Sequence, residues 1–396
     1  ITYREDGEIR RNPDRELIRN LDELPFPARH LVPLSKYRAF KAGCDMITGR
    51  GCPYSCTFCV GHRILGRKTR FRDIGACVDE FEEIVYGLGF KRVNIVDDTL
   101  TVNHKRIFRF CDEILERGIR VEWTAFSRVD TVTRELLVRM KEAGCCFICY
   151  GVESGNQRIL DLAKKRITLE KIRSAIALTN EVGIDSLSSF ILGLPGETKE
   201  TIRETFEFGK SLGNKYAFHV LAPYPGTEVR MRAEELGLRI LNNDWLRYDA
   251  NQAVTETGDV SAEYINRVIR EFNDSIEAAM ERKEELKRQG KLGRKDEEEI
   301  ELRRRRRFAW QILKNDYIER HGRFKHAGDP VELLAEKLHT FKTVVSILAR
   351  DQIAEEIREM LREDILGYRV ENGTVTWFWK DPVLEEQKAT LNQYQP

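Results

Sequence analysis

Three cysteines stand close together in the segment 51–59, Gly-Cys-Pro-Tyr-Ser-Cys-Thr-Phe-Cys. Cys52, Cys56 and Cys59 are spaced four and three residues apart. Thiolates hold iron–sulfur clusters, and this spacing lets one short loop bind three corners of a cubane cluster. The fourth iron then has no protein ligand from this loop and is open to a small molecule.

Zinc is the alternative metal, with His62 completing a Cys₃His site. Nine cysteines in a chain without a secretory signal argue against a disulfide framework. We expect the other six to be small buried side chains: Cys44, Cys77, Cys111, Cys145, Cys146 and Cys149.

Short β-rich segments alternate with amphipathic helical patterns from about residue 45 to 240. Such alternation predicts right-handed βα units and a parallel sheet, with functional groups at the carboxyl ends of the strands. Six units are too few for a closed eight-stranded barrel, so the pattern predicts an α/β fold with a partial (βα)₆ TIM-like barrel or a doubly wound sheet. The predicted strands are Met46–Thr48, Arg92–Val96, Val121–Phe126, Phe147–Val152, Leu187–Leu192 and Ala217–Leu221.

The segments on either side of this series differ in character. Residues 1–40 contain Leu-Pro-Phe-Pro at 24–27 and are expected to be a linker. We expect residues 41–245 to form the barrel and residues 246–396 a mainly helical region ending in a hairpin around Asn372-Gly373. The charged run 281–307 predicts a solvated helix with pairs such as Glu299–Arg303.

The composition fits a folded chain with a core of its own. Of the 396 residues, 41% are hydrophobic and 33% are charged, with a formal net charge of +1. No global field therefore steers the chain toward nucleic acid or an anionic membrane. The apolar runs are too short to span a bilayer, and a cytoplasmic location is expected.

The Cys-x₃-Cys-x₂-Cys loop follows the first predicted strand, with Phe58 just before the last cysteine, and resembles the radical S-adenosylmethionine (SAM) superfamily. The resemblance implies a [4Fe–4S] cluster whose open iron chelates the amino and carboxylate groups of SAM. It implies reductive cleavage of SAM to methionine and a 5′-deoxyadenosyl radical under anaerobic conditions. It also implies an electron donor such as flavodoxin or ferredoxin. No catalytic residue is assigned beyond the cluster ligands.

The same resemblance assigns SAM contacts at later strand ends. Asp97 and Asp98 are expected to face the SAM ammonium, with a helix N-cap as the alternative. Glu153 and Ser154 are expected near the ribose hydroxyls, and Arg128 could pair with the SAM carboxylate as a fork.

The segment 189–197 resembles the superfamily's GxIxGxxE motif. It places Leu192 and Gly193 at the adenine, and Phe58 is counted among the cofactor contacts. Ser189 replaces the first glycine and Glu197 stands one position late, so no role is assigned to Glu197.

Three segments resemble the cobalamin-binding class of this superfamily, which includes C-methyltransferases and an anaerobic ring cyclase. They are the linker at 21–29, the Asp97-Asp98-Thr99 strand end and Pro-Tyr-Pro-Gly-Thr at 223–227. The class has an N-terminal cobalamin domain, which is not found in this sequence. Because the chain begins with Ile1, we expect it to be a piece of a longer protein and cobalamin to be bound outside it.

The implied function is methylation or cyclisation at an unactivated carbon of a small-molecule or lipid-like substrate. A methylthiotransferase-like enzyme is the first alternative. An iron–sulfur electron carrier or a degenerate, non-catalytic scaffold is the second, and its spectrum would not respond to SAM.

Overall fold

The structure is a computed structural model that describes residues 2–325 and 327–380. Contacts divide the chain into two units. The sheet unit contains the residues up to 25, 45–82 and 94–267, and the helical unit contains 26–44, 83–93 and the residues from 268 on. The sequence placed its boundaries at 40 and 245. Residues 246–267 instead group with the sheet because Val254 and Ile265 are buried there.

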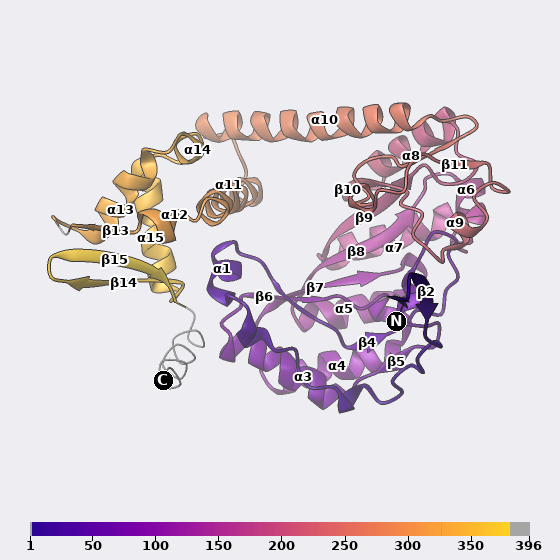
Figure 1. The fold of residues 1–396 in the computed structure, drawn as a ribbon, viewed down its shortest axis with the longest axis horizontal. Helices are drawn as coiled ribbons and strands as arrows, with labels where there is room; N and C mark the ends of the chain where they lie inside the picture. Colours follow the sequence, from indigo (N-terminus) through magenta and orange to yellow (C-terminus); the bar gives the residue numbers. More distant parts are fainter. Residues whose placement is uncertain (1, 326, 381–396) are drawn as a thin grey trace. The chain divides into compact units, whose positions relative to one another are not determined.

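Six strands form one sheet in the order β10-β9-β8-β7-β6-β3. β4 and β5 form a separate two-stranded sheet. The six strands otherwise follow chain order, so each strand lies beside the one before it in the sequence. The predicted α/β partial barrel is confirmed, and Figure 1 shows the strands fanning through the magenta part of the ribbon. The strands are β3 (Cys44–Met46), β6 (Arg92–Ile95), β7 (Glu122–Ser127), β8 (Cys145–Glu153), β9 (Asp185–Leu192) and β10 (Lys215–Val220).

Helices follow most of these strands, and several begin at a side-chain cap. Asn103, Thr133, Thr168 and Thr198 each accept a hydrogen bond from the backbone N–H three residues on, which satisfies one free donor of the first turn. The helices of the sheet unit are α3 (Ile74–Glu82), α4 (His104–Glu116), α5 (Arg134–Glu142), α6 (Gln157–Leu162), α7 (Leu169–Val182) and α8 (Lys199–Ser211).

The core of the sheet unit lies between the strands and these helices. Phe110 stands edge-to-face with both Phe81 and Trp123, and all three side chains are fully buried. Gly144 has a φ of +95°, and a Cβ there would lie 2.3 Å from the Val121 carbonyl oxygen. Only glycine therefore fits between α5 and β8.

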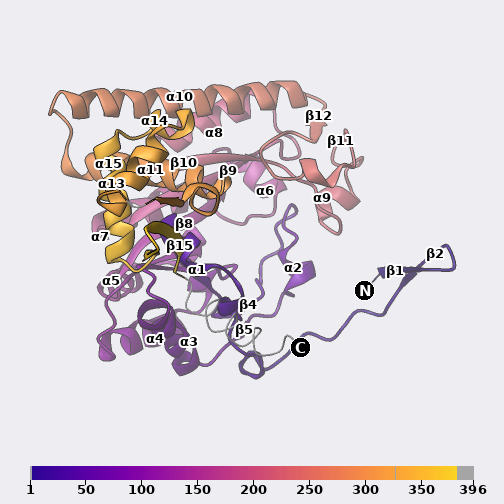
Figure 2. The same ribbon diagram turned by 60° about the vertical axis from the view of Figure 1, so that its left-hand side comes forward.

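Short elements complete the sheet unit. In Figure 2 the hairpin of β1 and β2 projects away from the sheet, and all of its residues are exposed. The short elements are β1 (Thr2–Glu5), β2 (Glu8–Arg11), η1 (Leu21–Glu23), β4 (Gly49–Arg50), α2 (Gly61–Ile64), β5 (Arg70–Phe71), η4 (Leu100–Val102), η5 (Val129–Thr131), α9 (Glu228–Met231), β11 (Leu238–Ile240), η6 (Trp245–Arg247) and β12 (Thr255–Thr257).

The helical unit has a core of its own, in which Phe308, Leu334, Ile357 and Trp377 are buried together. It ends in the hairpin of β14 and β15, where Asn372 and Gly373 both have positive φ, as a type I′ turn requires. Its elements are η2 (Arg29–Leu31), α1 (Leu34–Ala39), η3 (Glu83–Gly87), α11 (Arg294–Lys314), α12 (Tyr317–His321), β13 (Arg323–Lys325), α13 (Pro330–His339), α14 (Lys342–Val345), α15 (Arg350–Arg362), β14 (Leu366–Glu371) and β15 (Thr374–Trp379), and α10 (Ala262–Arg288) crosses into it from the sheet unit.

The charged run pairs between helices as well as along one helix, as in Arg294–Glu298 of α11. Glu299 binds Lys283 of α10, and Arg303 binds Glu277 of α10. The expected Glu299–Arg303 pair is therefore replaced by interhelical pairs, because α10 and α11 lie within reach of each other. None of the described helices is long and apolar enough to cross a membrane.

Candidate functional site at the cysteine loop

The cysteine loop is closed at its base by backbone pairing. β4 pairs antiparallel with β5, and the Cys52 N–H donates to the Gly66 carbonyl oxygen at 3.3 Å. Gly51 begins the loop with a φ of +96°, and a Cβ there would lie 2.6 Å from the Lys68 carbonyl oxygen. Glycine is therefore required at this turn, which holds the three cysteines on one short excursion of the chain.

Each of the three sulfur atoms has a polar group nearby. The Gly61 N–H donates to Cys59 Sγ at 3.3 Å. The Thr99 hydroxyl oxygen lies 3.8 Å from Cys52 Sγ and donates its own proton to the Asp98 carbonyl oxygen at 2.6 Å. Arg128 Nη1 lies 3.9 Å from Cys56 Sγ. Donors aimed at sulfur stabilise thiolates and tune the potentials of clusters that they hold.

Burial acts on two of these thiols in the opposite sense. It raises the pKa of Cys56, against the lowering effect of Lys165 and Arg128, and it raises the pKa of Cys59, against the bond from Gly61. The neutral thiols are therefore favoured in the absence of a metal, and a metal that binds here displaces their protons.

Arg128, at the end of β7, ties the cysteine loop to two other segments. Its guanidinium carbon lies 3.6 Å from the centroid of the Tyr54 ring. Nε and Nη2 bind the two carboxylate oxygens of Asp130 at 2.9 and 3.0 Å, and Nη2 also donates to the Lys165 carbonyl oxygen at 2.8 Å. Asp130 therefore occupies the paired N–H donors that the resemblance assigned to the SAM carboxylate. The third nitrogen, Nη1, faces Cys56.

The two aspartates at the end of β6 have different surroundings. Asp97 is buried and accepts bonds from the Thr48 N–H at 2.7 Å and the Thr48 hydroxyl at 2.6 Å. Burial raises its pKa and these bonds oppose the rise. Asp98 is exposed and accepts a bond from the Gly51 N–H at 3.2 Å. Asp97 braces the ends of β3 and β6, and Asp98 lies against the cysteine loop.

Glu153, the last residue of β8, forms a buried ion pair. Lys165 Nζ donates to Glu153 Oε1 at 2.6 Å, and the two residues are 5% and 7% exposed. Glu153 has a φ of +73°, and Lys164 and Arg166, on either side of the lysine, have φ of +53° and +57°. Backbone strain of this kind persists only where the surroundings enforce it.

Ser154 follows directly but does not face an open site. Its side chain is fully buried, 3.2 Å from the Thr205 hydroxyl, and it accepts the Asn156 N–H at 3.2 Å. Ser154 therefore fixes the chain where it enters α6.

Leu192 and Gly193 form the turn at the end of β9. The Leu192 side chain is buried and its carbonyl oxygen accepts the Leu221 N–H at 2.8 Å. The N–H groups of Gly193 and Leu194 donate to Glu197 Oε2 at 2.6 and 3.2 Å. Glu197 is fully buried, which raises its pKa to about 8.

Phe58 is half-buried and packs against an apolar cluster that contains Ile159, Leu194 and Leu221. This cluster connects the cysteine loop with the turn after β9. Arg128 contacts Cys56 and the Lys165 backbone, Lys165 binds Glu153, and Asp98 accepts the Gly51 N–H of the cysteine loop. These contacts connect the cysteine loop with the carboxyl ends of the strands.

Lys165 and Glu197 were missed as site residues. Lys165 stands in Ala-Lys-Lys-Arg at 163–166, which has the composition of a solvated loop. Only the structure distinguishes it, through the positive φ of its two neighbours. For Glu197, the signal was the motif resemblance itself, with the acid displaced by one position.

The donor set suits a cubane cluster. Within the described part of the chain, no three His, Cys, Asp or Glu side chains stand close enough to share one metal ion. A cubane makes a different demand, because each thiolate binds a separate iron and the sulfurs need not converge on one point. Three cysteines on one loop, two of them with a donor to the sulfur, fit that demand.

Comparisons with known proteins show which sequences and folds this chain is similar to. The model of the radical SAM superfamily matches residues 46–209. An uncharacterised methyltransferase of Pyrococcus horikoshii is 35% identical over 272 residues, which cover 68% of this chain and 59% of the relative. An anaerobic magnesium-protoporphyrin IX monomethyl ester cyclase of Rubrivivax gelatinosus is 29% identical over 256 residues, or 62% and 44% of the two chains.

The cobalamin-dependent radical enzyme OxsB, solved with aqua-cobalamin and S-adenosylmethionine, shares the fold. Its TM-score is 0.58 at 18% identity, over 99% of this chain and 61% of that one. The chain spans about half the length of the curated relatives it matches. Residues 46–209 are therefore a domain of the radical SAM superfamily.

Proposed function

We propose that Cys52, Cys56 and Cys59 hold a [4Fe–4S] cluster at which this chain cleaves SAM reductively. The observation that supports this most directly is that donors to the sulfurs of Cys56 and Cys59 and a buried Glu–Lys pair lie at one edge of the sheet. When bound, such a cluster supplies an electron and an open iron for SAM, which yields methionine and a 5′-deoxyadenosyl radical.

The residues around the loop would bind and orient SAM. Asp98 can accept hydrogen bonds from the SAM ammonium, since it lies against the cysteine loop and is exposed. Glu153 can accept those of the ribose hydroxyls, and Lys165 fixes its carboxylate in place. The backbone of Leu192 and Gly193, held by Glu197, would support the adenine.

The radical would then serve methylation or ring closure at an unactivated carbon of a small molecule. Similarity to both a methyltransferase and a cyclase supports this range. Cobalamin is the cofactor proposed for the methyl-transfer branch, and a flavodoxin- or ferredoxin-like protein the proposed electron donor. Full-length protein purified with the absorbance of bound cobalamin would support that branch.

Anaerobic reconstitution with iron and sulfide tests the core of the proposal. The wild-type protein should bind about four irons per chain, and dithionite with SAM should release 5′-deoxyadenosine. Cys56→Ala should lose both, because a cluster corner loses its ligand. Cys146→Ala, a half-buried cysteine on β8, should keep both and is the matched control.

A colourless, zinc-filled protein would contradict the cluster. A protein with its full complement of iron, whose spectrum does not change when SAM is added, would favour the electron carrier instead.

A further inference from the structure

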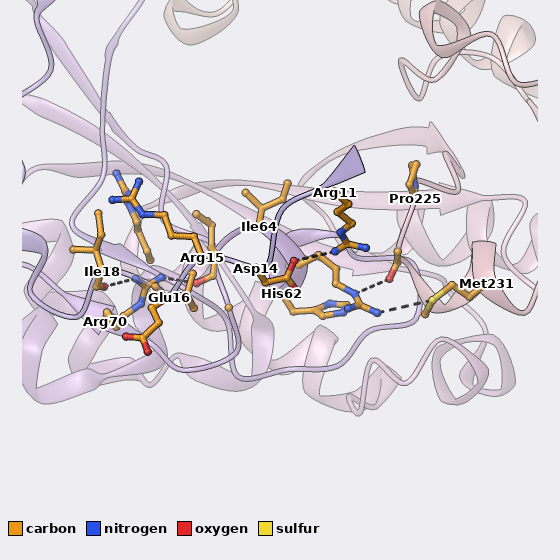
Figure 3. Close-up of a pocket in the computed structure, with 16 residues that line it drawn as sticks. Arg11, Asp14, Arg15, Glu16, Ile18, His62, Ile64, Arg70, Pro225 and Met231 are labelled. Atoms are coloured by element: carbon orange, nitrogen blue, oxygen red, sulfur yellow. Dashed lines mark hydrogen bonds and ion pairs between the residues drawn. The ribbon is translucent and has the colours of Figure 1, made fainter. Parts of the chain in front are cut away.

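A cavity of about 890 Å³ opens in the sheet unit beside the cysteine loop. Its walls come from residues 11–18, from the segment 62–66 that follows Cys59, from β4 and β5, and from the turn after β10 with α9. Figure 3 shows side chains of these segments around one space, with Arg11 beside Asp14 and Arg70 beside Ile18. A volume of this size is typical of sites for organic ligands.

Five arginines but only two acids line the cavity. Arg11 is paired with Asp14 at 2.9 Å. Arg63 Nε donates to the Gly226 carbonyl oxygen at 3.2 Å, and Arg70 Nη2 donates to the Leu65 carbonyl oxygen at 2.6 Å. Carbonyl oxygens fix these two guanidinium groups but do not cancel their charge.

Arg50 and Arg15 complete the set. Arg50 is half-buried and Arg15 exposed, and the side chain of neither has a hydrogen bond or ion pair with any of the residues that the structure describes. Glu16 is the other acid of the wall. Four arginines without a carboxylate partner therefore face one acid.

A partly buried guanidinium without a partner is unfavourable, and an anion relieves that cost. The cavity also shares a wall with the cysteine loop. Arg50 directly precedes Gly51 and Cys52, and the Gly66 carbonyl oxygen that accepts the Cys52 N–H belongs to a lining residue. An anion held at Arg50 would therefore lie beside the loop that holds the cysteines.

We propose that this cavity binds the oxyanion group, phosphate or carboxylate, of a small organic molecule, with Arg50 and Arg15 as its main ligands and Arg63 and Arg70 supplying fixed positive charge. Guanidinium groups bind both oxyanions through paired N–H donors. That the bound molecule is the substrate rests on the proposed function; that the cavity binds oxyanions does not.

Calorimetric titration of the protein, without added iron or SAM, with inorganic pyrophosphate and separately with citrate tests the site. We expect saturable binding of at least one anion that weakens as salt rises from 0.05 to 0.5 M. Arg50→Gln should weaken it roughly tenfold, or about 1.4 kcal/mol, since it removes a charged donor to the anion. Arg15→Gln should act in the same direction, and the double variant should bind less than either.

Arg294→Gln is the matched control, since that side chain is 92% exposed on α11 of the helical unit. Preference for pyrophosphate would assign a phosphate group to the ligand, and preference for citrate a carboxylate group. Equal affinity in Arg50→Gln, Arg294→Gln and wild type, or no binding of either anion, would overturn the site. Cys56→Ala should bind the anion normally, so that failure of the cluster and failure of the cavity are separate results.

Discussion

At the scale of single residues, the site depends on which polar groups face the sulfurs and which are already engaged. Arg128 and Lys165 are the two buried cations, and each binds one carboxylate. Asp97 and Ser154 are fully engaged with their neighbours, whereas Asp98 keeps an exposed carboxylate against the loop. The chemistry we propose therefore rests on fewer side chains than the motifs suggested.

Arg128 should set the reduction potential of a cluster bound at Cys56. Arg128→Met removes a positive charge near one sulfur, which destabilises the reduced, more negative cluster. We expect the midpoint potential to fall in an EPR-monitored redox titration and Arg128→Lys to fall less. Arg134→Met, a 49% exposed arginine, should leave the potential unchanged. A cluster-loaded Arg128→Met protein with the wild-type potential would remove Arg128 from this role.

Lys165 should support SAM binding through Glu153. Lys165→Met leaves a buried carboxylate without its cation, so we expect SAM affinity to fall roughly tenfold while the iron content is kept. Equilibrium binding of SAM to the reconstituted protein measures this. Lys164→Met is the matched control, because the Lys164 side chain is 46% exposed and pairs with Glu228 instead. Equal losses in both variants would contradict the assignment.

At the scale of elements, the turn after β9 depends on a single buried acid. Glu197 Oε2 holds the N–H groups of Gly193 and Leu194, and Oε1 has no partner among the described residues. A left-handed glycine and a buried carboxyl thus shape the turn expected to carry the adenine. The acid acts on the backbone from one position later than the motif places it.

Glu197 should make stability depend on pH. Its folded-state pKa of about 8 lies above the value of about 4.3 in unfolded chains. Between these values the unfolded chain binds fewer protons, so rising pH lowers the free energy of unfolding, by up to about 1.4 kcal/mol per pH unit. Glu197→Gln cannot titrate, and its stability relative to wild type should increase from pH 5 to pH 8.

Urea denaturation at both pH values measures this difference. Glu200→Gln, a 71% exposed acid on α8, should show no such increase. If Glu197→Gln and wild type change in parallel, the carboxyl does not titrate in this range.

At the scale of the whole molecule, two units have separate cores, and the candidate site lies within the sheet unit. The sheet unit is assembled from three chain segments and the helical unit from three. Segments that are far apart in the sequence therefore pack together in each unit.

This division predicts that SAM stabilises one part of the protein. Scanning calorimetry of the reconstituted full chain should resolve two transitions, and SAM at about 100 times its dissociation constant should add about 2.7 kcal/mol to one of them. Cys56→Ala should abolish that increase. Equal shifts of both transitions would show that the units unfold together.

Local patterns determined the six βα units and the cysteine loop. Strand and helix periodicity and the spacing of Cys52, Cys56 and Cys59 depend on residues near each other in the chain, so they are visible without a fold. The predicted end of β9 at Leu192 is confirmed, and β3 ends at Met46, two residues before the predicted end.

The tertiary structure alone decided the partners of the polar side chains. Arg128 and Cys56 are 72 residues apart, and Asp97 and Thr48 are 49 apart. Such pairs form only when the strand ends meet, and a buried charge then takes whichever partner the backbone brings within reach. For this reason the sequence pointed to the chemistry, whereas the assignment of Arg128 to Asp130, of Lys165 to Glu153 and of the arginines to one cavity required the fold.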